Sequence, residues 1–333
     1  YNDIIRKFID MYAGRLRNQV SFMLSACNFY MPIFEEALDA YGLPLELRYL
    51  PIIESALNPS AVSRAGASGL WQFMIGTGKI YGLESNSLVD ERRDPIKATW
   101  AAARYLKEMY DIYGDWNLVI AAYNCGPGTI NKAIRRANGE TDYWKIYNYL
   151  PKETRGYVPA FIAANYVMTY YCDHNICPME TNIPASTDTV QVNKNLHFEQ
   201  IADLCNVPLD QIKSLNPQYK KHMIPGDSKP YTLRLPIDAI STFIDKQDTI
   251  YAHRADELFR NRKTVAVKEI TPSTRKTTAA VAGKGKLTYY TIKSGDTLST
   301  IAGKYGVTIK DIQRWNGMSN TKIAAGKRLK IYK

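Results

Sequence analysis

One carboxyl group in the chain stands where it could work as an acid. Glu54 follows Leu50-Pro51-Ile52-Ile53, so it ends an apolar segment of helical pattern. An apolar setting disfavours the charged form of a carboxyl group, raises its pKa and lets it hold a proton near neutral pH. Such a group can protonate a leaving group as a general acid. The alternative interpretation is a solvated glutamate beside a capped helix end.

Small and hydrogen-bonding residues follow Glu54 closely, namely Ser63, Gly66, Gly69 and Gln72. Glycine allows a backbone to approach a ligand, and serine and glutamine supply hydrogen bonds. These residue types would suit a ligand site next to the carboxyl group, but taken alone they favour a capped helix end with a solvated glutamate.

Two later segments mix aromatic and polar residues in the same way. Residues 121–126 read Ala-Ala-Tyr-Asn-Cys-Gly, and residues 153–159 read Glu-Thr-Arg-Gly-Tyr-Val-Pro. Taken singly, Tyr123 and Tyr157 could be packing rings, and the Asn-Cys-Gly sequence could end a helix. Only the order of these segments along the chain favours a site.

Helices are the elements that must position these residues. Apolar residues recur with helical period from Tyr1 to about Tyr171, in blocks separated by Gly, Pro and Asn. The clearest blocks are 29–41, 44–54, 95–113 and 116–123. We expect an all-helical domain over residues 1–180, which is large enough to bury a core.

The remainder of the chain contains an internal repeat. A shift of 100 residues places Ile201, Ala202, Val207, Ile212 and Asn216 on Ile301, Ala302, Val307, Ile312 and Asn316. In each copy short β-branched runs flank a helical pair, which predicts small βααβ modules over residues 187–236 and 287–333. Between them we expect a connecting segment over residues 237–286 that ends in a flexible basic linker.

The positive charge is a property of the C-terminal part. The chain has a net charge of +11, but residues 261–333 hold 16 Lys and Arg against 3 acids, which leaves −2 for residues 1–260. A tail of this kind can bind nucleic acid, anionic lipid or an anionic polymer, or it can solubilise a linker. We favour the solubilising role and expect no nucleic-acid partner, because no recognition helix or base-stacking platform is apparent.

Membrane spans and metal sites are not expected. No stretch reaches the roughly 20 apolar residues of a spanning helix. The five Cys include no CxxC pair, and the four His are scattered, so we expect neither a metal nor a cofactor. Cys172 and Cys177 could form a disulfide in an oxidising compartment or remain free thiols.

Taken together, the N-terminal motifs resemble the lytic transglycosylases of glycoside hydrolase family 23, which have a goose-lysozyme-like fold. The resemblance covers Leu43 to about Tyr171. It rests on Glu54-Ser55, Gly69-Leu70-Trp71-Gln72, residues 122–126 and residues 153–159, which occur in the family's order. It implies a mainly α fold, with a lysozyme-like all-helical catalytic domain followed by the small modules.

The resemblance also assigns roles to residues. It implies that Glu54 is the catalytic acid/base. The implied substrate-binding residues are Ser63, Gln72, Tyr123, Asn124, Glu153 and Tyr157. Cys125 stands where Ala or Ser is usual in the family, and we interpret it as a packing residue and not a nucleophile.

The repeated modules resemble LysM modules, which bind glycans that contain N-acetylglucosamine. The second copy carries the signature in residues 290–298 and in Trp315-Asn316-Gly317. The resemblance places Gly295, Asp296, Thr297 and Asn316 near the sugar. The first copy has Lys194-Asn195-Leu196-His197 in place of the Gly-Asp-Thr sequence, so we expect a degenerate module that serves as a spacer.

The implied activity is cleavage of the β-1,4 bond between N-acetylmuramic acid and N-acetylglucosamine in peptidoglycan, with formation of a 1,6-anhydro sugar. We expect a monomer in the periplasm or cell envelope, after removal of an N-terminal signal not present in this sequence, with membrane anchoring left open. One alternative is a hydrolysing muramidase, in which Asp94 or Glu153 would hold the attacking water. The other is a peptidoglycan-binding scaffold without catalysis. The sequence leaves exo and endo cleavage open.

Overall fold

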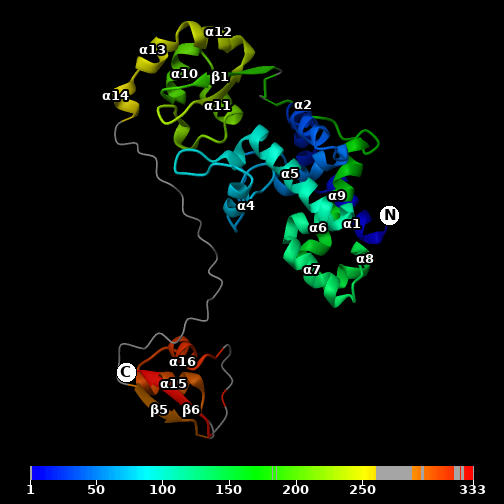
Figure 1. The fold of residues 1–333 in the computed structure, drawn as a ribbon, viewed down its shortest axis with the longest axis vertical. Helices are drawn as coiled ribbons and strands as arrows, with labels where there is room; N and C mark the ends of the chain where they lie inside the picture. Colours follow the sequence, from blue (N-terminus) through cyan, green and yellow to red (C-terminus); the bar gives the residue numbers. More distant parts are fainter. Residues whose placement is uncertain are drawn as a thin grey trace. The chain divides into compact units, whose positions relative to one another are not determined.

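The computed structural model of the 333-residue chain describes residues 2–181, 183–184, 186–259, 287–293, 296–318, 323 and 326–332. The chain divides into two compact units, Tyr1–Glu269 and Ile270–Lys333, which are described separately (Figure 1).

The first part of the larger unit is helical, and we call residues 2–181 the helical domain. Its α-helices are α1 (Asp3–Ala13), α2 (Arg17–Ala40), α3 (Leu50–Ser55), α4 (Ile75–Ile80), α5 (Pro95–Tyr113), α6 (Trp116–Cys125), α7 (Pro127–Arg136), α8 (Tyr143–Ile146) and α9 (Lys152–Thr169). Short 3₁₀ turns are η1 (Leu45–Tyr49), η2 (Glu91–Arg93) and η3 (Tyr147–Tyr149). The all-helical character expected for this part of the chain is thus confirmed.

Local sequence explains where these helices begin. Asn2, Asp115 and Asp142 accept hydrogen bonds from the first amides of α1, α6 and α8. Asp94 does the same for α5, whose first residue is Pro95. Each cap satisfies amide groups that the first helical turn leaves unpaired.

The helix expected over residues 44–54 is divided in two. The 3₁₀ turn η1 is followed by α3, which has Pro51 in its first turn. Pro51 has no N–H to donate, so the preceding turn does not continue as a regular α-helix across it. The division gives Glu54 a short helix of its own.

A single apolar core supports the helical domain. α9 packs against α1, α3 and α6, and α5 packs against α2 and α6. Phe34, Trp71 and Leu106 are among its completely buried side chains. No helix in the described part of the chain has both the length and the apolar composition needed to cross a bilayer.

The first repeat follows in the same unit. Strands β1 (Thr187–Val192) and β4 (Tyr231–Pro236) pair antiparallel, with Val190 opposite Leu233. A second antiparallel pair joins β2 (Asn195–His197) to β3 (Met223–Pro225). Between them lie α10 (Phe198–Cys205), α11 (Leu209–Leu215) and η4 (Lys220–His222). The βααβ order expected for this copy is present.

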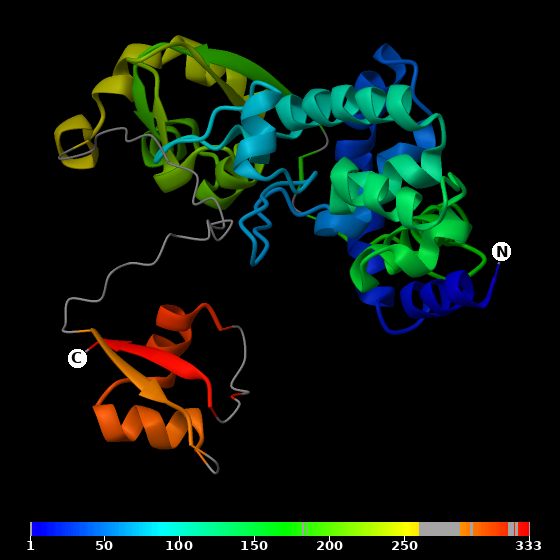
Figure 2. The same cartoon turned by 60° about the horizontal axis from the view of Figure 1, so that its bottom comes forward.

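Part of the expected connecting segment is folded onto this repeat. Helices α12 (Ile237–Asp245), α13 (Gln247–Ala252) and α14 (Ala255–Leu258) continue the chain, and α12 packs against β1, β4 and α10 (Figure 2). The buried side chains of Phe243 and Ile250 join the core of the first repeat. The expected basic linker over residues 261–286 lies outside the described residues.

The helical domain and the first repeat share a core. Leu88 and Val89, from the segment before α5, are buried in the apolar cluster of the repeat. The backbone of this segment also bonds to the repeat, from Asp90 N to Gln218 O at 2.8 Å and from Lys220 N to Leu88 O at 2.7 Å. The first repeat is therefore packed against the helical domain as part of one compact unit.

The smaller unit contains the second repeat. Strands β5 (Leu287–Thr291) and β6 (Arg328–Tyr332) pair antiparallel, and α15 (Leu298–Tyr305) and α16 (Ile309–Asn316) lie between them in sequence. Thr297 and Thr308 cap the two helices with capping boxes. Its core includes Ile301, Ile312 and Ile331. The expected βααβ order is confirmed here too.

Candidate active site

Glu54 lies in the last turn of α3, where the chain leaves the helix through Ala56 and Leu57, both with positive φ. The next residue, Ser55, fixes this turn, because its hydroxyl hydrogen-bonds to the carbonyl oxygens of Pro51 and Leu70 at 3.0 and 2.9 Å. The side chain of Glu54 is half-buried. A short, pinned helix thus holds one carboxyl group at the edge of the core.

The surroundings of Glu54 raise its pKa. The pKa is raised to about 7, mainly by burial of the carboxyl group and also by the negative charge of Glu153. The hydroxyl of Tyr157, on α9, donates a hydrogen bond to Glu54 Oε1, which opposes it. Near neutral pH the group is therefore poised both to give and to take a proton.

The expected residues Ser63 and Gln72 lie on the loop that follows α3. Ser63 Oγ accepts a hydrogen bond from Ala67 N at 3.0 Å, which closes a tight turn. Gln72 has a left-handed backbone with φ of 49°, and its Nε2 donates to Gly69 O at 2.8 Å. Both side chains line the same pocket as Glu54, a cavity of about 420 Å³.

Arg92 holds the loop of residues 61–73 in place through hydrogen bonds. Its Nη1 donates to the carbonyl oxygens of Gly66 and Phe73 at 2.8 and 3.0 Å, and its Nε and Nη2 donate to Asp90 at 2.8 and 2.7 Å. Gly69 lies so close that an added Cβ would stand 1.8 Å from Arg92 O. Only glycine fits there, which explains the first residue of the Gly69-Leu70-Trp71-Gln72 motif.

The pair of Arg92 and Asp90 is buried, with Asp90 1% and Arg92 5% exposed. Burial alone would raise the pKa of Asp90, but the hydrogen bonds and charge of Arg92 lower it below the ordinary value. Lys220 of the first repeat lies 3.7 Å from the same carboxylate. The first repeat is thus connected to the active-site loop through one ionic network. Sequence reasoning missed Arg92, because no local pattern pairs it with residues 66 and 73.

Tyr123 and Asn124 lie at the end of α6. The hydroxyl of Tyr123 donates to Trp71 O at 2.8 Å, and Asn124 Oδ1 accepts a hydrogen bond from Thr154 Oγ1 at 2.8 Å. Burial, followed by the negative charge of Glu54, raises the pKa of Tyr123 and of Tyr157 well above the ordinary value. The two tyrosines therefore lie within electrostatic reach of the same carboxyl group.

The structure thus brings the predicted residues together in two groups. Glu54, Ser63 and Gln72 line the 420 Å³ pocket. Tyr123, Asn124 and Glu153 do not line it. Tyr123 and Asn124 lie at the end of α6, and Glu153 lies at the start of α9. The charge of Glu54 acts on Tyr123, and the charge of Glu153 acts on Glu54. Tyr12 and Gln19, from α1 and α2, also line the pocket and were not predicted. They precede the region that the motifs cover.

The two candidates for a second carboxylate differ in setting. Asp94 accepts hydrogen bonds from Ile96 N and Lys97 N at 2.9 and 3.0 Å, so its side chain serves as the cap of α5. Glu153 is exposed in the first turn of α9 and acts on Glu54 through its charge. Among the described residues that line the pocket, Glu54 is the one acid.

In the second repeat, the predicted sugar-binding residues have internal partners. Asp296 Oδ2 accepts hydrogen bonds from Tyr290 Oη and Lys293 N, both at 2.8 Å. Asn316 Nδ2 donates to Ile312 O and Lys330 O, and its Oδ1 accepts from Lys330 N. Gly295 lies outside the described residues.

Asn216 of the first repeat makes the same three bonds, to Ile212 O, Arg234 O and Arg234 N. The repeated asparagine thus ties the second helix to the last strand in both copies. This use of the side chain explains why the repeat preserves it.

No cluster of three or more His, Cys, Asp or Glu side chains in the described ranges could hold a metal ion. The five cysteines are free thiols in this structure, and Cys172 and Cys177 are both exposed. Burial raises the pKa of the Cys125 thiol, which is unfavourable for a nucleophile.

Three protein families match parts of the chain. Residues 31–146 match the transglycosylase SLT domain. Residues 186–252 match the LysM-like domain of lytic transglycosylase MltD, and residues 290–331 match the LysM domain. The second match extends past β4 into α12 and α13, in agreement with the packing of these helices on the first repeat.

Two individual relatives are named as lytic murein transglycosylases. The membrane-bound lytic murein transglycosylase D of Escherichia coli (strain K12) is 33% identical over 294 residues, which cover 87% of this chain and 60% of that protein. This chain therefore spans well under two thirds of that relative. The soluble lytic murein transglycosylase of the same strain is 33% identical over 124 residues, 35% of this chain and 19% of the relative.

Among solved structures, the 70 kDa soluble lytic transglycosylase of Escherichia coli matches with 29% identity and a TM-score of 0.38, over 43% of this chain and 24% of that chain. The chain thus combines a transglycosylase SLT domain, an MltD-type LysM-like domain and a LysM domain, which confirms the resemblance to the lytic transglycosylases that its motifs indicate.

Proposed function

We propose that the protein is a peptidoglycan lytic transglycosylase in which Glu54 is the single acid/base. The observation that carries the proposal is the half-buried carboxyl group of Glu54, with a pKa of about 7, in a pocket between α3, α1 and the loop of residues 61–73. The SLT domain match and the names of the relatives support the substrate class.

In the proposed reaction, protonated Glu54 donates its proton to the glycosidic oxygen between N-acetylmuramic acid and N-acetylglucosamine. The bond between this oxygen and C1 of the muramic acid breaks, and the N-acetylglucosamine leaves as an alcohol. The C6 hydroxyl of the same muramic acid then bonds to C1, and the Glu54 carboxylate takes its proton. The product is a 1,6-anhydro sugar, water is not consumed, and Glu54 is protonated again.

This scheme needs one carboxyl group, because the substrate supplies its own nucleophile. Hydrolysing glycosidases usually hold two carboxylates on opposite sides of the scissile bond. Asp94 is already engaged as a helix cap, and Glu153 is exposed, so neither is held as a partner of Glu54 in the pocket. Their settings favour the transglycosylase over the muramidase alternative.

The remaining predicted residues would either bind the sugars or adjust the Glu54 carboxyl group. Ser63 and Gln72 lie beside Glu54 and offer hydrogen-bonding groups to the glycan strand. Tyr123 and Asn124 are proposed to lie beside the acetamido group, which would stabilise the positive charge that develops at C1. Tyr157 orients the Glu54 carboxyl through its hydrogen bond. Glu153 would raise the proton affinity of Glu54.

We propose further that the second repeat binds the glycan and so holds the enzyme on the insoluble wall. The LysM match supports this role, and the basic charge of residues 261–333 suits an anionic polymer. On this proposal the protein acts on peptidoglycan in the periplasm or cell envelope.

Replacement of Glu54 by Gln tests the assignment. The amide keeps the shape and the hydrogen-bonding capacity but cannot transfer a proton, and general acid–base catalysis alone contributes about 10²–10⁴-fold. We expect Glu54→Gln to lower the release of soluble fragments from sacculi at least 100-fold, with unchanged circular dichroism. Retention of more than a few per cent of the activity would contradict the role of Glu54.

A further inference from the structure

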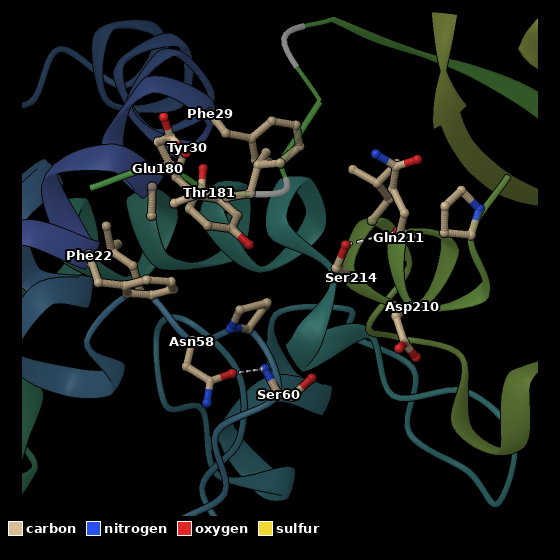
Figure 3. A pocket seen from close by; sticks show the side chains of 16 residues that line it. Phe22, Phe29, Tyr30, Asn58, Ser60, Glu180, Thr181, Asp210, Gln211 and Ser214 are labelled. Atoms are coloured by element: carbon tan, nitrogen blue, oxygen red, sulfur yellow. Dashed lines mark hydrogen bonds between the residues drawn. The ribbon is translucent and has the colours of Figure 1, made fainter. Parts of the chain in front are cut away.

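A second cavity lies next to the Glu54 pocket, and the proposed reaction does not use it. It has a volume of about 1060 Å³ and opens between the helical domain and the first repeat (Figure 3). Leu57 to Ser60 form one wall, and Ala61 to Ser63 directly after them line the Glu54 pocket. One short loop therefore separates the two cavities.

The walls of this cleft are fixed relative to each other. The first repeat contacts the helical domain through the shared core around Val89 and through Glu84, which pairs with Lys229 at 2.7 Å and accepts from Tyr231 Oη at 3.1 Å. Glu180, Thr181 and Ile183, which lie in the chain between the helical domain and the first repeat, also line the cleft. A cavity held in this way is preformed, as small-ligand sites commonly are.

The two sides of the cleft differ chemically. α2 contributes the rings of Phe22, Phe29 and Tyr30, and Figure 3 shows α11 on the opposite side with Gln211 and Ser214. Phe22 is 42% exposed, so its ring is accessible to a ligand in the cleft. An apolar wall that faces amide and hydroxyl groups fits a peptide, which carries both apolar side chains and backbone hydrogen-bonding groups.

The charge of the cleft is negative. Glu180 and Asp210 line it, and no Lys or Arg is among its described lining residues. Asp210 is paired with Lys213 at 3.0 Å, whereas Glu180 forms no salt bridge with any described residue. An unpaired carboxylate favours a ligand with a free amino group.

We infer that this cleft binds the peptide stem of the glycan strand whose muramic acid lies at Glu54. The inference rests on the proposed function and names the part of the substrate that the cleft recognises. The stem is the branch of an otherwise linear strand, it contains small apolar residues, and its diamino acid carries an amino group. A stem of about five residues extends to roughly 17 Å, which allows it to enter a neighbouring cavity.

The test compares two forms of one substrate, glycan strands with their peptide stems and the same strands after an amidase has removed the stems. For the full chain we expect kcat/KM to be about tenfold higher on the strands with stems, the equivalent of about 1.4 kcal/mol. With Glu180→Gln this ratio falls at least threefold. With Ser214→Trp, which fills the cleft from an exposed position on α11, it falls close to one.

Asp238→Asn is the matched control, because Asp238 is an exposed acid at the start of α12 in the first repeat and lies outside the cleft. It should leave the ratio unchanged. Circular dichroism verifies that each variant is folded, and Glu180→Gln remains informative if Ser214→Trp is not.

The outcomes separate the two proposals. If Ser214→Trp and Glu180→Gln slow both substrates equally, the cleft belongs to the path of the glycan itself and the inference is wrong. A ratio near one in the unmodified protein, or a ratio that neither variant changes, also overturns it. If the unmodified protein cleaves neither substrate, it is the proposed function that fails.

Discussion

Replacement of Arg92 by Met should destabilise the loop of residues 61–73, which lines the Glu54 pocket, far more than replacement of an exposed arginine would. The change leaves the buried Asp90 with Lys220, at 3.7 Å, as its remaining ion-pair partner among the described residues, and it removes the donor to the carbonyl oxygens of residues 66 and 73. Breaking a buried ion pair by removing one partner costs about 3–5 kcal/mol. We expect the free energy of unfolding of the larger unit to fall by about that amount.

Urea unfolding followed by tryptophan fluorescence measures this cost, since Trp71 belongs to the loop and its side chain is fully buried. The matched control is Arg104→Met. Arg104 is 55% exposed and pairs with Glu108 one helical turn away, so its loss should cost less than about 1 kcal/mol. If Arg92→Met cost no more than Arg104→Met, the network would not hold the loop.

A double-mutant cycle examines the same pair more directly. Asp90→Leu with Arg92→Met leaves no unpaired buried charge on either residue, so the double variant should be more stable than the sum of the single changes predicts. A coupling energy near zero would refute the view that Asp90 and Arg92 act as one unit.

Three further predictions concern the carboxyl group and the domains. Tyr157→Phe removes the hydrogen bond that lowers the pKa of Glu54, so the alkaline limb of the pH–rate profile should move to higher pH; an unmoved limb would contradict this. Because the folded pKa of Glu54, about 7, lies above the ordinary value of 4.5, the folded state loses stability as pH rises from about 4.5 to about 7 and stays less stable above that. Glu54→Gln should therefore raise the free energy of unfolding by up to about 3 kcal/mol at pH 8 and hardly at pH 4, and an equal effect at both pH values would contradict this account. A chain that ends at residue 259 should cleave soluble glycan strands at the full rate. A chain that ends at residue 180 exposes Leu88 and Val89, so its free energy of unfolding should be lower than that of the chain ending at residue 259 by about 3 kcal/mol or more. Equal thermal midpoints for the two chains would count against the shared core.

Much of the fold followed from local patterns in the sequence. The helical period and the repeat with a shift of 100 residues both depend on neighbours along the chain. Local patterns carry this information because a helix or a hairpin buries its apolar residues at a fixed spacing. The match of strands, helices and repeat order shows how far such rules reach in this chain.

The supports of the site could not be predicted in this way. Arg92 reaches carbonyl groups 19 and 26 positions away, and Leu88 and Val89 complete a core whose other members begin at residue 192. No spacing rule connects such residues, since tertiary contacts decide them. Helices α12 and α13, which follow β4, were likewise missed as part of the first repeat, because the packing of α12 against β1 and of both helices against α10 has no signature within the segment itself.

The fate of water tests the central claim most directly. Sacculi digested by the protein in water enriched in oxygen-18 can be analysed by mass spectrometry of the released fragments. The account predicts fragments one water lighter than the hydrolysis products, with no heavy oxygen at C1 of the muramic acid. Fragments that carry heavy oxygen at a reducing end would contradict it and would make Glu54 the acid of a hydrolase.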